Sequence, residues 1–258
     1  MNLGLLDLPA PLLDALDGAL DRIGVPAFLR VVTYAAASAW MGMALYRRLS
    51  DQRRLAEVGA QVVLSQQMLA RHEGDFATLR VLILANLRAT SRHLALTLRP
   101  ALIAGLPLLF ALPWLSNRFD FRQPETGTSI SVCVQPVVRD LRWQVTSAAT
   151  AAAPGCWLTP WPDVEKPATL SDSAGRTLLV IPNAATSDTV EKFGWFNWLI
   201  GNPAGYLPSD AALASVHIAL SQRQILPVGP AWLRGWVFWY FLAALLVSLW
   251  LKWRWRLH

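Results

Sequence analysis

The residues PAFLRVVTYAAASAWMGMALY, numbers 26–46, form the apolar run that decides the fold. Their number is close to the ~20 residues that an α-helix needs to cross the hydrocarbon core of a bilayer. Arg47 and Arg48 end this run abruptly. A second apolar run, PALIAGLPLLFALPWL at 100–115, begins directly after Arg99. We therefore predict transmembrane helices over residues 26–46 and 100–115.

The segment between these two runs, residues 47–99, is rich in Arg, Gln, Leu and Val and has few turn signals. Apolar residues recur in it at helical spacing on two arms: Leu55, Val58, Val62 and Leu69, then Phe76, Leu79, Ile83 and Leu87. Gly74 and Asp75 between the arms supply a helix stop and an N-cap. This pattern predicts an antiparallel coiled-coil hairpin over 47–99.

A third apolar run covers residues 232–251 and predicts a third transmembrane helix, followed by a basic tail over 252–258 with Lys252, Arg254 and Arg256. Residues 47–99 hold nine arginines against four acids, whereas residues 1–27 hold four aspartates against one arginine. Positive charge next to a membrane helix favours the cytoplasmic side. We therefore expect a multi-pass protein of the bacterial inner (cell) membrane, with its N-terminus outside and its C-terminus in the cytoplasm.

The N-terminal residues 1–25 predict an amphipathic helix, because Leu12, Leu16 and Leu20 recur between aspartates. An acidic start is unlike the basic start of a secretory signal. We expect this helix to lie on the outer surface of the membrane; the alternative is that it packs on the protein's own outer domain. Arg30, near the outer end of the first span, is expected to reach the membrane surface.

Residues 117–228 change in character, with short alternating runs separated by Pro, Ser and Thr, which predicts a β-sandwich-like periplasmic domain. One hairpin is expected around Ser173–Gly175. The domain holds Cys133 and Cys156, the two cysteines of the chain. An oxidising compartment would join them in a disulfide bond; the alternative is two buried free thiols. The aromatic segment 193–199 (FGWFNWL) is expected to return the chain to the membrane surface.

The composition is that of a membrane protein: 54% of the residues are hydrophobic, 16% are charged, and 13 are Trp. The net charge of +6 could indicate nucleic acid, but the arginines cluster beside apolar runs, so we expect the bilayer and no nucleic acid as partner. Nucleotide-binding loops and HExxH, CxxC and GxSxG patterns do not occur, and the four histidines are scattered. We therefore predict no enzyme activity, cofactor or metal site.

Two blocks of sequence resemble the YidC/Oxa membrane-insertase superfamily. The run from Leu98-Arg99-Pro100 through Pro107 to Trp114 is similar to the family's second span, and Trp232 with Trp239-Tyr240-Phe241-Leu242 is similar to its third. The layout looks closest to the three-span branch that includes the third subunit of the ER membrane protein complex and archaeal relatives. Two features depart from the family. A domain of about 110 residues separates spans two and three, and Leu246-Val247-Ser248 carries no charge midway along the third span.

With the β-domain expected over 117–228, the chain is predicted to be an α+β membrane protein. The resemblance implies that it acts as a chaperone, assisting insertion or folding of client membrane proteins through a groove between three helices. The residues expected to line that groove are Thr33, Ser38, Arg47, Arg99 and Ser248. The alternative is a structural scaffold subunit of a dedicated inner-membrane complex, which binds partners through its periplasmic domain and forms a hetero-oligomer. A signalling receptor is disfavoured because the chain holds no recognisable cytoplasmic output module.

Overall fold

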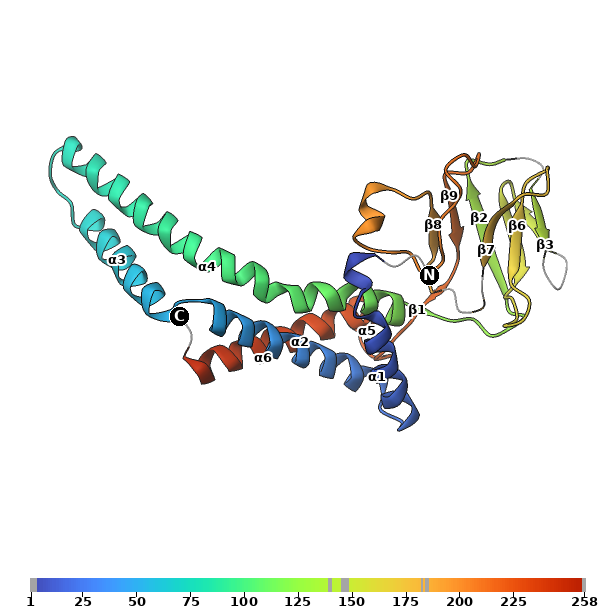
Figure 1. The fold of residues 1–258 in the computed structure, drawn as a ribbon, viewed down its shortest axis with the longest axis horizontal. Coiled ribbons are helices and arrows are strands. Elements are labelled where there is room, and N and C mark those ends of the chain that lie inside the picture. The colour runs from blue at the N-terminus through green and yellow to red at the C-terminus, as the bar shows by residue number, and fades with distance from the viewer. Residues whose placement is uncertain (1–3, 139–140, 145–148, 182, 184–185, 257–258) are drawn as a thin grey trace. The chain divides into compact units, whose positions relative to one another are not determined.

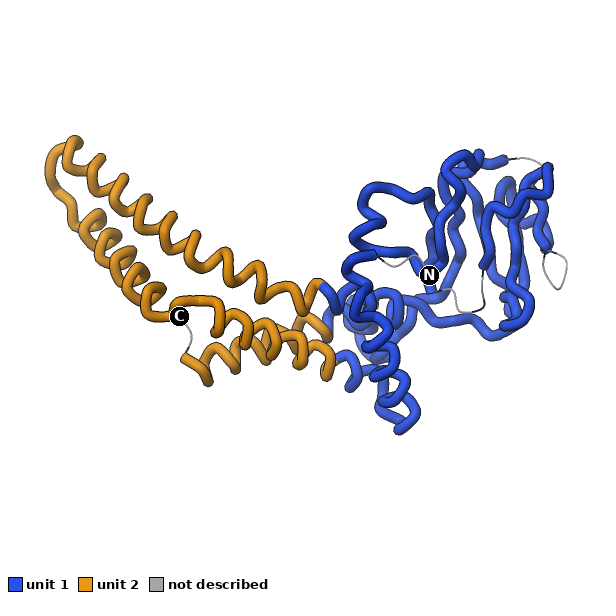
Figure 2. Tube along the Cα trace, in the orientation of Figure 1, with its two compact units in different colours: residues 1–31, 110–239 blue, residues 32–109, 240–258 orange. Residues whose placement is uncertain are grey.

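The computed structural model describes residues 4–138, 141–144, 149–181, 183 and 186–256, and shows a mixed α+β fold (Figure 1). The helical elements are η1 (Leu5–Asp7), α1 (Ala10–Arg22), α2 (Ala27–Leu49), α3 (Gln52–Ala70), α4 (Phe76–Phe119), η2 (Trp195–Trp198), α5 (Ala231–Arg234) and α6 (Trp236–Trp255). The chain divides into two compact units (Figure 2). Unit 1 holds residues 1–31 and 110–239, and unit 2 holds residues 32–109 and 240–258.

Three helices, α2, α4 and α6, are long and apolar enough to cross a membrane, which confirms the predicted number of candidate spans. Their boundaries differ from the predicted ones. The expected second arm of the hairpin and the expected second span are one continuous helix, α4, of 44 residues. Pro100, Pro107 and Pro113 lie inside it without ending it. Proline is tolerated in a membrane helix because neighbouring groups satisfy the backbone carbonyls that it leaves free.

The third candidate span also begins later than expected. Residues 231–234 form the short helix α5, Gly235 adopts an extended conformation, and α6 then runs from Trp236 to Trp255. Lys252 and Arg254 therefore belong to the last turn of α6. Basic side chains in that position compensate the negative end of the helix dipole.

Unit 2 contains a helical hairpin made of α3 and the first half of α4. The first arm buries Leu55 and Val58, as its pattern predicts. The second arm does not follow the prediction, because Phe76, Ile83 and Leu87 are exposed. The less exposed stripe of that arm is Leu79, Leu82, Asn86, Ala89, His93 and Leu96. The apolar residues of α4 cover more than one face of the helix. The spacing of apolar residues alone therefore did not identify the face that packs on α3. A coiled-coil geometry stays a prediction.

Close packing of α2 on α4 in unit 2 depends on Gly42. A Cβ atom at Gly42 would lie 2.6 Å from the backbone oxygen of Ala104 and 3.6 Å from Cδ1 of Leu108. Small residues let two membrane helices approach until their backbones touch, which maximises dispersion contacts. The Gly42–Ala104 contact therefore fixes the distance between the two helices.

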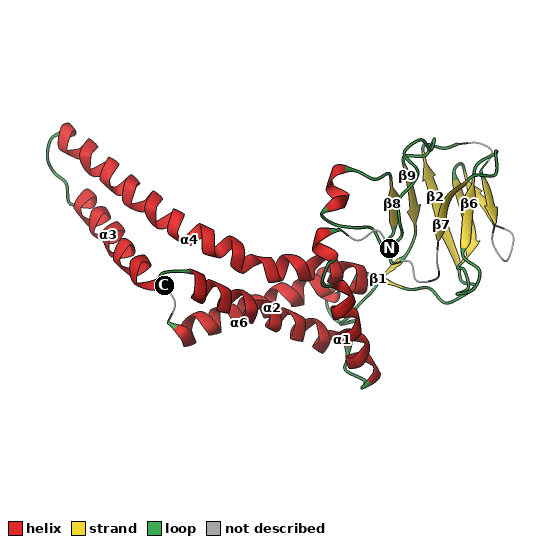
Figure 3. Ribbon diagram, viewed as in Figure 1, coloured by secondary structure: helices red, strands yellow, loops and turns green. Residues whose placement is uncertain are grey.

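Unit 1 contains the β-domain, whose strands are shown in yellow in Figure 3. One sheet has the order β4 (Thr150–Ala153), β5 (Cys156–Pro160), β2 (Ser129–Gln135), β9 (Ser215–Ile218) and β8 (Thr189–Glu191). The other has the order β3 (Arg142–Gln144), β6 (Ala168–Ser171) and β7 (Thr177–Ile181), and β1 (Phe121–Arg122) pairs with β10 (Ser221–Gln222). All the pairings between these strands are antiparallel.

Both larger sheets contribute to one hydrophobic core, in which Val132 and Ile218 meet residues such as Leu170 and Ile181. Inward-facing residues alternate along β2, as expected for a strand with one buried face. The predicted hairpin between 168–170 and 177–181 is confirmed, with Gly175 at φ +79° in its turn. The two sheets thus bury their apolar faces against each other; the periplasmic location of this domain stays a prediction.

The structure joins Cys133 and Cys156 in a disulfide bond, as predicted. The two residues are direct partners on the neighbouring antiparallel strands β2 and β5. The aromatic segment that was expected to lead back to the membrane lies instead between β8 and β9, two strands of the same sheet. Its sequence, in which four of seven residues are aromatic, does not reveal that the chain returns to the sheet afterwards.

The start of the chain is attached to this domain. Asp7 is buried, and its Oδ2 accepts hydrogen bonds from the backbone N–H groups of Gly4 (2.9 Å) and Gly201 (2.7 Å). The backbone N–H of Leu6 donates to the carbonyl of Leu199. Residues 4–7 therefore pack on the β-domain, whereas the position of the amphipathic helix α1 relative to a membrane stays a prediction.

We predict that Gly42→Leu destabilises the protein, because the new side chain overlaps the backbone of α4 at Ala104. Overpacking of this kind costs about 1–3 kcal/mol. The measurement is the apparent melting temperature of the purified full-length protein in detergent. The matched control is Gly105→Leu, at a glycine where a Cβ atom would meet nothing within 4 Å. Equal melting temperatures for the two variants would contradict the packing described here.

Candidate functional site

A buried ion-pair cluster joins three helices in unit 1. Asp17 of α1 is fully buried and accepts hydrogen bonds from Arg30 Nη1 of α2 (2.9 Å) and from Arg118 Nε of α4 (2.8 Å). The Arg30 side chain is only 4% exposed and also contacts the carboxylate of Asp21 at 2.9 Å. Arg30 therefore has partners inside the protein, and its position at the membrane surface stays a prediction. Its buried charge is retained because two carboxylates compensate it.

Two further aspartates receive indole N–H groups in the same unit. Asp14 accepts a hydrogen bond from Trp114 Nε1 at 2.8 Å, and Asp120 accepts one from Trp236 Nε1. A Trp N–H that is partly buried needs an acceptor, and a carboxylate is a strong one. These bonds connect α1 to α4 and the end of α4 to the start of α6.

Phe119 provides an apolar centre for this polar cluster. Its ring is fully buried, with the guanidinium carbon of Arg30 at 5.7 Å and that of Arg223 at 5.1 Å from its centroid. Such cation–π contacts stabilise an arginine that has lost part of its hydration. Burial, followed by the positive charges of Arg30 and Arg118, lowers the pKa of Arg223 below its ordinary value. Positive charge is therefore crowded around Phe119.

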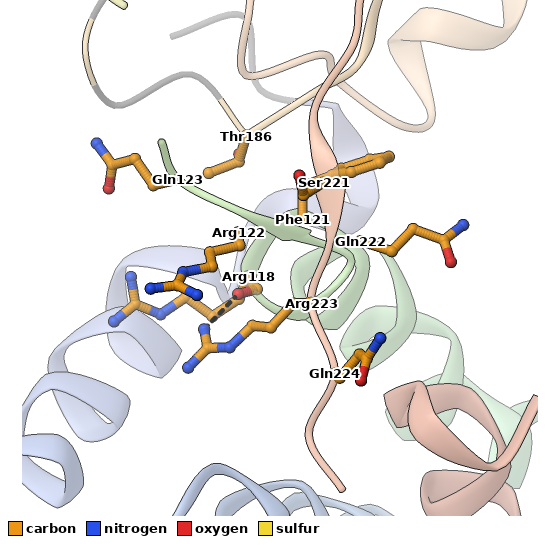
Figure 4. Close-up of a pocket in the computed structure, with 9 residues that line it drawn as sticks. All are labelled: Arg118, Phe121, Arg122, Gln123, Thr186, Ser221, Gln222, Arg223 and Gln224. Atoms are coloured by element: carbon orange, nitrogen blue, oxygen red, sulfur yellow. Dashed lines mark hydrogen bonds between the residues drawn. The ribbon is translucent and has the colours of Figure 1, made fainter. Parts of the chain in front are cut away.

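Two cavities open beside this cluster. The first, of about 620 Å³, is lined by three arginines, Arg118, Arg122 and Arg223, together with Phe121, Gln123, Thr186, Ser221, Gln222 and Gln224. Figure 4 shows the three guanidinium groups gathered on one side of the β1–β10 ribbon. The second cavity, of about 590 Å³, is mainly apolar and includes Trp232, Trp236 and Phe238 among its lining residues. Both cavities share Phe121, Gln222 and Arg223.

The five residues predicted to line a groove lie in unit 2 in different environments. Ser38 is buried, donates to the Tyr34 carbonyl at 2.8 Å, and lies within hydrogen-bonding reach of the Tyr240 hydroxyl. Arg47 is exposed and its guanidinium carbon lies 5.4 Å from the ring centroid of Trp255.

The other three predicted groove residues are less buried than Ser38. Thr33 and Arg99 are exposed, and Ser248 is half-buried. The structure thus places Ser38 at the interface of α2 with α6, but it does not gather the five residues in one described contact cluster. Their common role in a groove stays a prediction.

The sequence reading missed the arginines around Phe119. Arg118, Arg122 and Arg223 are distant in the chain, and only the pairing of β1 with β10 brings them together. One signal was available: Arg30 interrupts an apolar run, and a charge in such a run needs a partner. The four aspartates in residues 7–21 were the candidate partners for the Arg30 charge.

The comparisons with known proteins add no assignment. No protein-family model, curated protein or solved structure matches the chain. Within the described residues, no group of three or more His, Cys, Asp or Glu side chains is arranged to hold a metal ion.

We predict that Asp17→Asn strongly destabilises the protein, because Arg30 then keeps a buried charge and loses its buried partner. Removing one member of a buried pair costs about 3–5 kcal/mol. For a chain of this size the apparent melting temperature in detergent should fall by about 10 °C.

The matched control for this prediction is Asp21→Asn, because that carboxylate also contacts Arg30 but is 61% exposed. An exposed pair contributes about 1 kcal/mol or less. The double variant Asp17→Leu with Arg30→Met removes both buried charges and should recover part of the lost stability. Loss of the same size in the Asp17 and Asp21 variants would show that burial of the pair is not what stabilises the unit.

Proposed function

We propose that this protein is an insertase-type chaperone of the bacterial inner membrane, which assists insertion or folding of other membrane proteins. The observation that supports this role best is the low burial of its candidate spans. Only 11% of the most apolar window of α4 and 22% of that of α6 are buried within the chain. Membrane helices in a self-contained bundle bury more of their surface against each other. Much of the surface of α4 and α6 is therefore available to a client helix or to lipid.

The proposed mechanism uses polar groups along these helices. A short polar segment of a client resists transfer into hydrocarbon, because each unsatisfied polar group costs several kcal/mol. Ser248 is half-buried on α6 and supplies a hydroxyl group, whereas Ser38 is buried and donates to the Tyr34 carbonyl. Arg47 and Arg99 are exposed and offer positive charge at the proposed cytoplasmic side. A hydrated path of this kind, with a locally thinned bilayer, lowers the barrier to passage.

The proposed orientation places unit 1 outside the cell. α1 supports this, because Leu12, Leu16 and Ile23 are 49–75% exposed while Asp17 is buried. The apolar face of this helix thus points away from the protein, as in a helix that lies on a membrane surface. The nine arginines of the 47–99 segment favour the cytoplasm for the hairpin.

A second candidate function, a scaffold subunit of a membrane complex, is favoured by the aromatic segment between β8 and β9. Phe193, Trp195, Phe196 and Trp198 are 47–81% exposed. Exposed aromatic side chains are enriched at protein–protein contact sites. In this alternative, a hetero-oligomeric partner covers the segment, and the three helices anchor the complex without acting on clients.

The proposed topology predicts the labelling of an introduced thiol. Glu73→Cys places a cysteine in the exposed loop between α3 and α4, and the native cysteines are joined to each other. In intact spheroplasts, a membrane-impermeant maleimide should not label position 73 before lysis. Ser173→Cys, in the exposed hairpin turn of the outer domain, is the control and should be labelled at once. Labelling of position 73 without lysis would reverse the orientation.

The chaperone function predicts an activity in purified form. Liposomes that contain the protein should insert a client with one membrane helix and a short translocated tail several-fold faster than protein-free liposomes. Arg99→Gln should slow insertion, whereas Arg53→Gln, an exposed hairpin arginine, should leave it unchanged. If the protein shows no acceleration and is recovered from native membranes in fixed stoichiometry with other subunits, the scaffold function replaces the chaperone function.

A further inference from the structure

Two cavities of opposite chemistry adjoin each other in unit 1. The first is lined by Arg118, Arg122 and Arg223, and the second has Trp232 and Phe238 in its wall. Three residues at the β1–β10 ribbon line both cavities: Phe121, Gln222 and Arg223. A ligand that occupied both would need an anionic end and an apolar end.

The protein compensates the positive charge of the arginine-lined cavity only in part, and Arg223 Nη1 donates to the backbone carbonyl of Arg118 at 3.2 Å. Asp17 already accepts from two arginines, Arg30 and Arg118. In the part of the chain that the structure describes, no ion pair joins Arg122 or Arg223 to an acid. Arg122, which is exposed, and Arg223, which is half-buried, thus line the same cavity as Arg118, and neither forms an ion pair with a carboxylate of the described residues.

The geometry of these groups suits a phosphate. Guanidinium is planar and presents several N–H donors in a fixed arrangement, which matches phosphate oxygens. The three arginines line one cavity, and in the view of Figure 4 their guanidinium groups lie on the same side of the β1–β10 ribbon, to which Ser221 belongs. An anion between them would also relieve the repulsion among Arg118, Arg122 and Arg223.

The position of the cavities identifies the kind of anion. The arginine-lined cavity lies at the end of α4, and the aromatic cavity lies at the start of α6. Both helices are candidate membrane spans, so these ends mark the level where hydrocarbon gives way to water. Trp side chains are enriched at that level. A phospholipid places its phosphate and the top of its acyl chains at the same level.

We propose that unit 1 binds an anionic phospholipid, with the headgroup phosphate on Arg122 and Arg223 and the upper acyl chain against Trp232 and Phe238. The site is separate from the proposed groove in unit 2, and it would serve a chaperone and a scaffold equally. Free phosphate shares the headgroup chemistry, but it has no use for the apolar cavity. The experiment therefore compares a lipid with a water-soluble phosphate.

The test is native mass spectrometry of the purified full-length protein in detergent, titrated with phosphatidylglycerol or phosphatidylcholine. We expect phosphatidylglycerol to bind about tenfold more tightly, since one charge-assisted interaction contributes about that factor. Arg122→Gln with Arg223→Gln should abolish the preference. Arg142→Gln, at an exposed arginine of β3, should retain it. Arg122→Gln alone removes only an exposed side chain, so it tests the site even if the double variant does not fold.

The apolar half of the site is tested by Trp232→Ala, with Trp253→Ala at the far end of α6 as control. Both indoles are exposed, by 63% and 78%. Trp232→Ala should weaken binding of both lipids several-fold, and Trp253→Ala should not. Equal binding of the two lipids, or an unchanged preference in the Arg122 variant, would overturn the proposal. So would displacement of phosphatidylglycerol by millimolar inorganic phosphate, because it would show a free-phosphate site.

Discussion

The burial of Asp17 between Arg30 and Arg118 is the interaction on which unit 1 depends. Each of these charges would be costly in an apolar environment alone, and the three together are tolerated because the carboxylate of Asp17 pairs with both guanidinium groups. The requirement is strict, since a carboxylate must come from α1 and the guanidiniums from α2 and α4. The pairing therefore determines how three helices, two of them candidate membrane spans, converge.

This pairing also explains the orientation of the N-terminal helix. An amphipathic helix at a water-facing surface normally buries its leucines and exposes its acids. α1 does the reverse at Asp17. Pairing the arginines of the neighbouring helices with a carboxylate stabilises the protein more than burying Leu12 and Leu16 within it would. The leucines are left for an apolar environment outside the chain. A membrane surface supplies one, which links the buried charge to the proposed location of the helix.

The sequence predicted the features that depend on local pattern and composition. Three apolar runs predicted three candidate spans. The chain has two cysteines, which predicted the disulfide, and the turn residues around Gly175 predicted the hairpin. It did not predict features that depend on competition between faces or on distant partners. α4 carries too many apolar residues to reveal its packed stripe. The arginine-lined cavity brings together Arg118 and Arg223, which are separated by the whole β-domain.

The β1–β10 ribbon shows how a large β-domain lies in the chain between two candidate membrane spans, α4 and α6. The chain leaves α4 through Phe121 and Arg122, and it returns through Ser221 and Gln222, which are their direct antiparallel partners. The two ends of the inserted segment are therefore as close as the ends of a hairpin. A domain whose two ends are this close needs no long connection at either end. The same strand pairing brings Arg122 and Arg223 together with Arg118, the partner of Asp17, in the wall of one cavity.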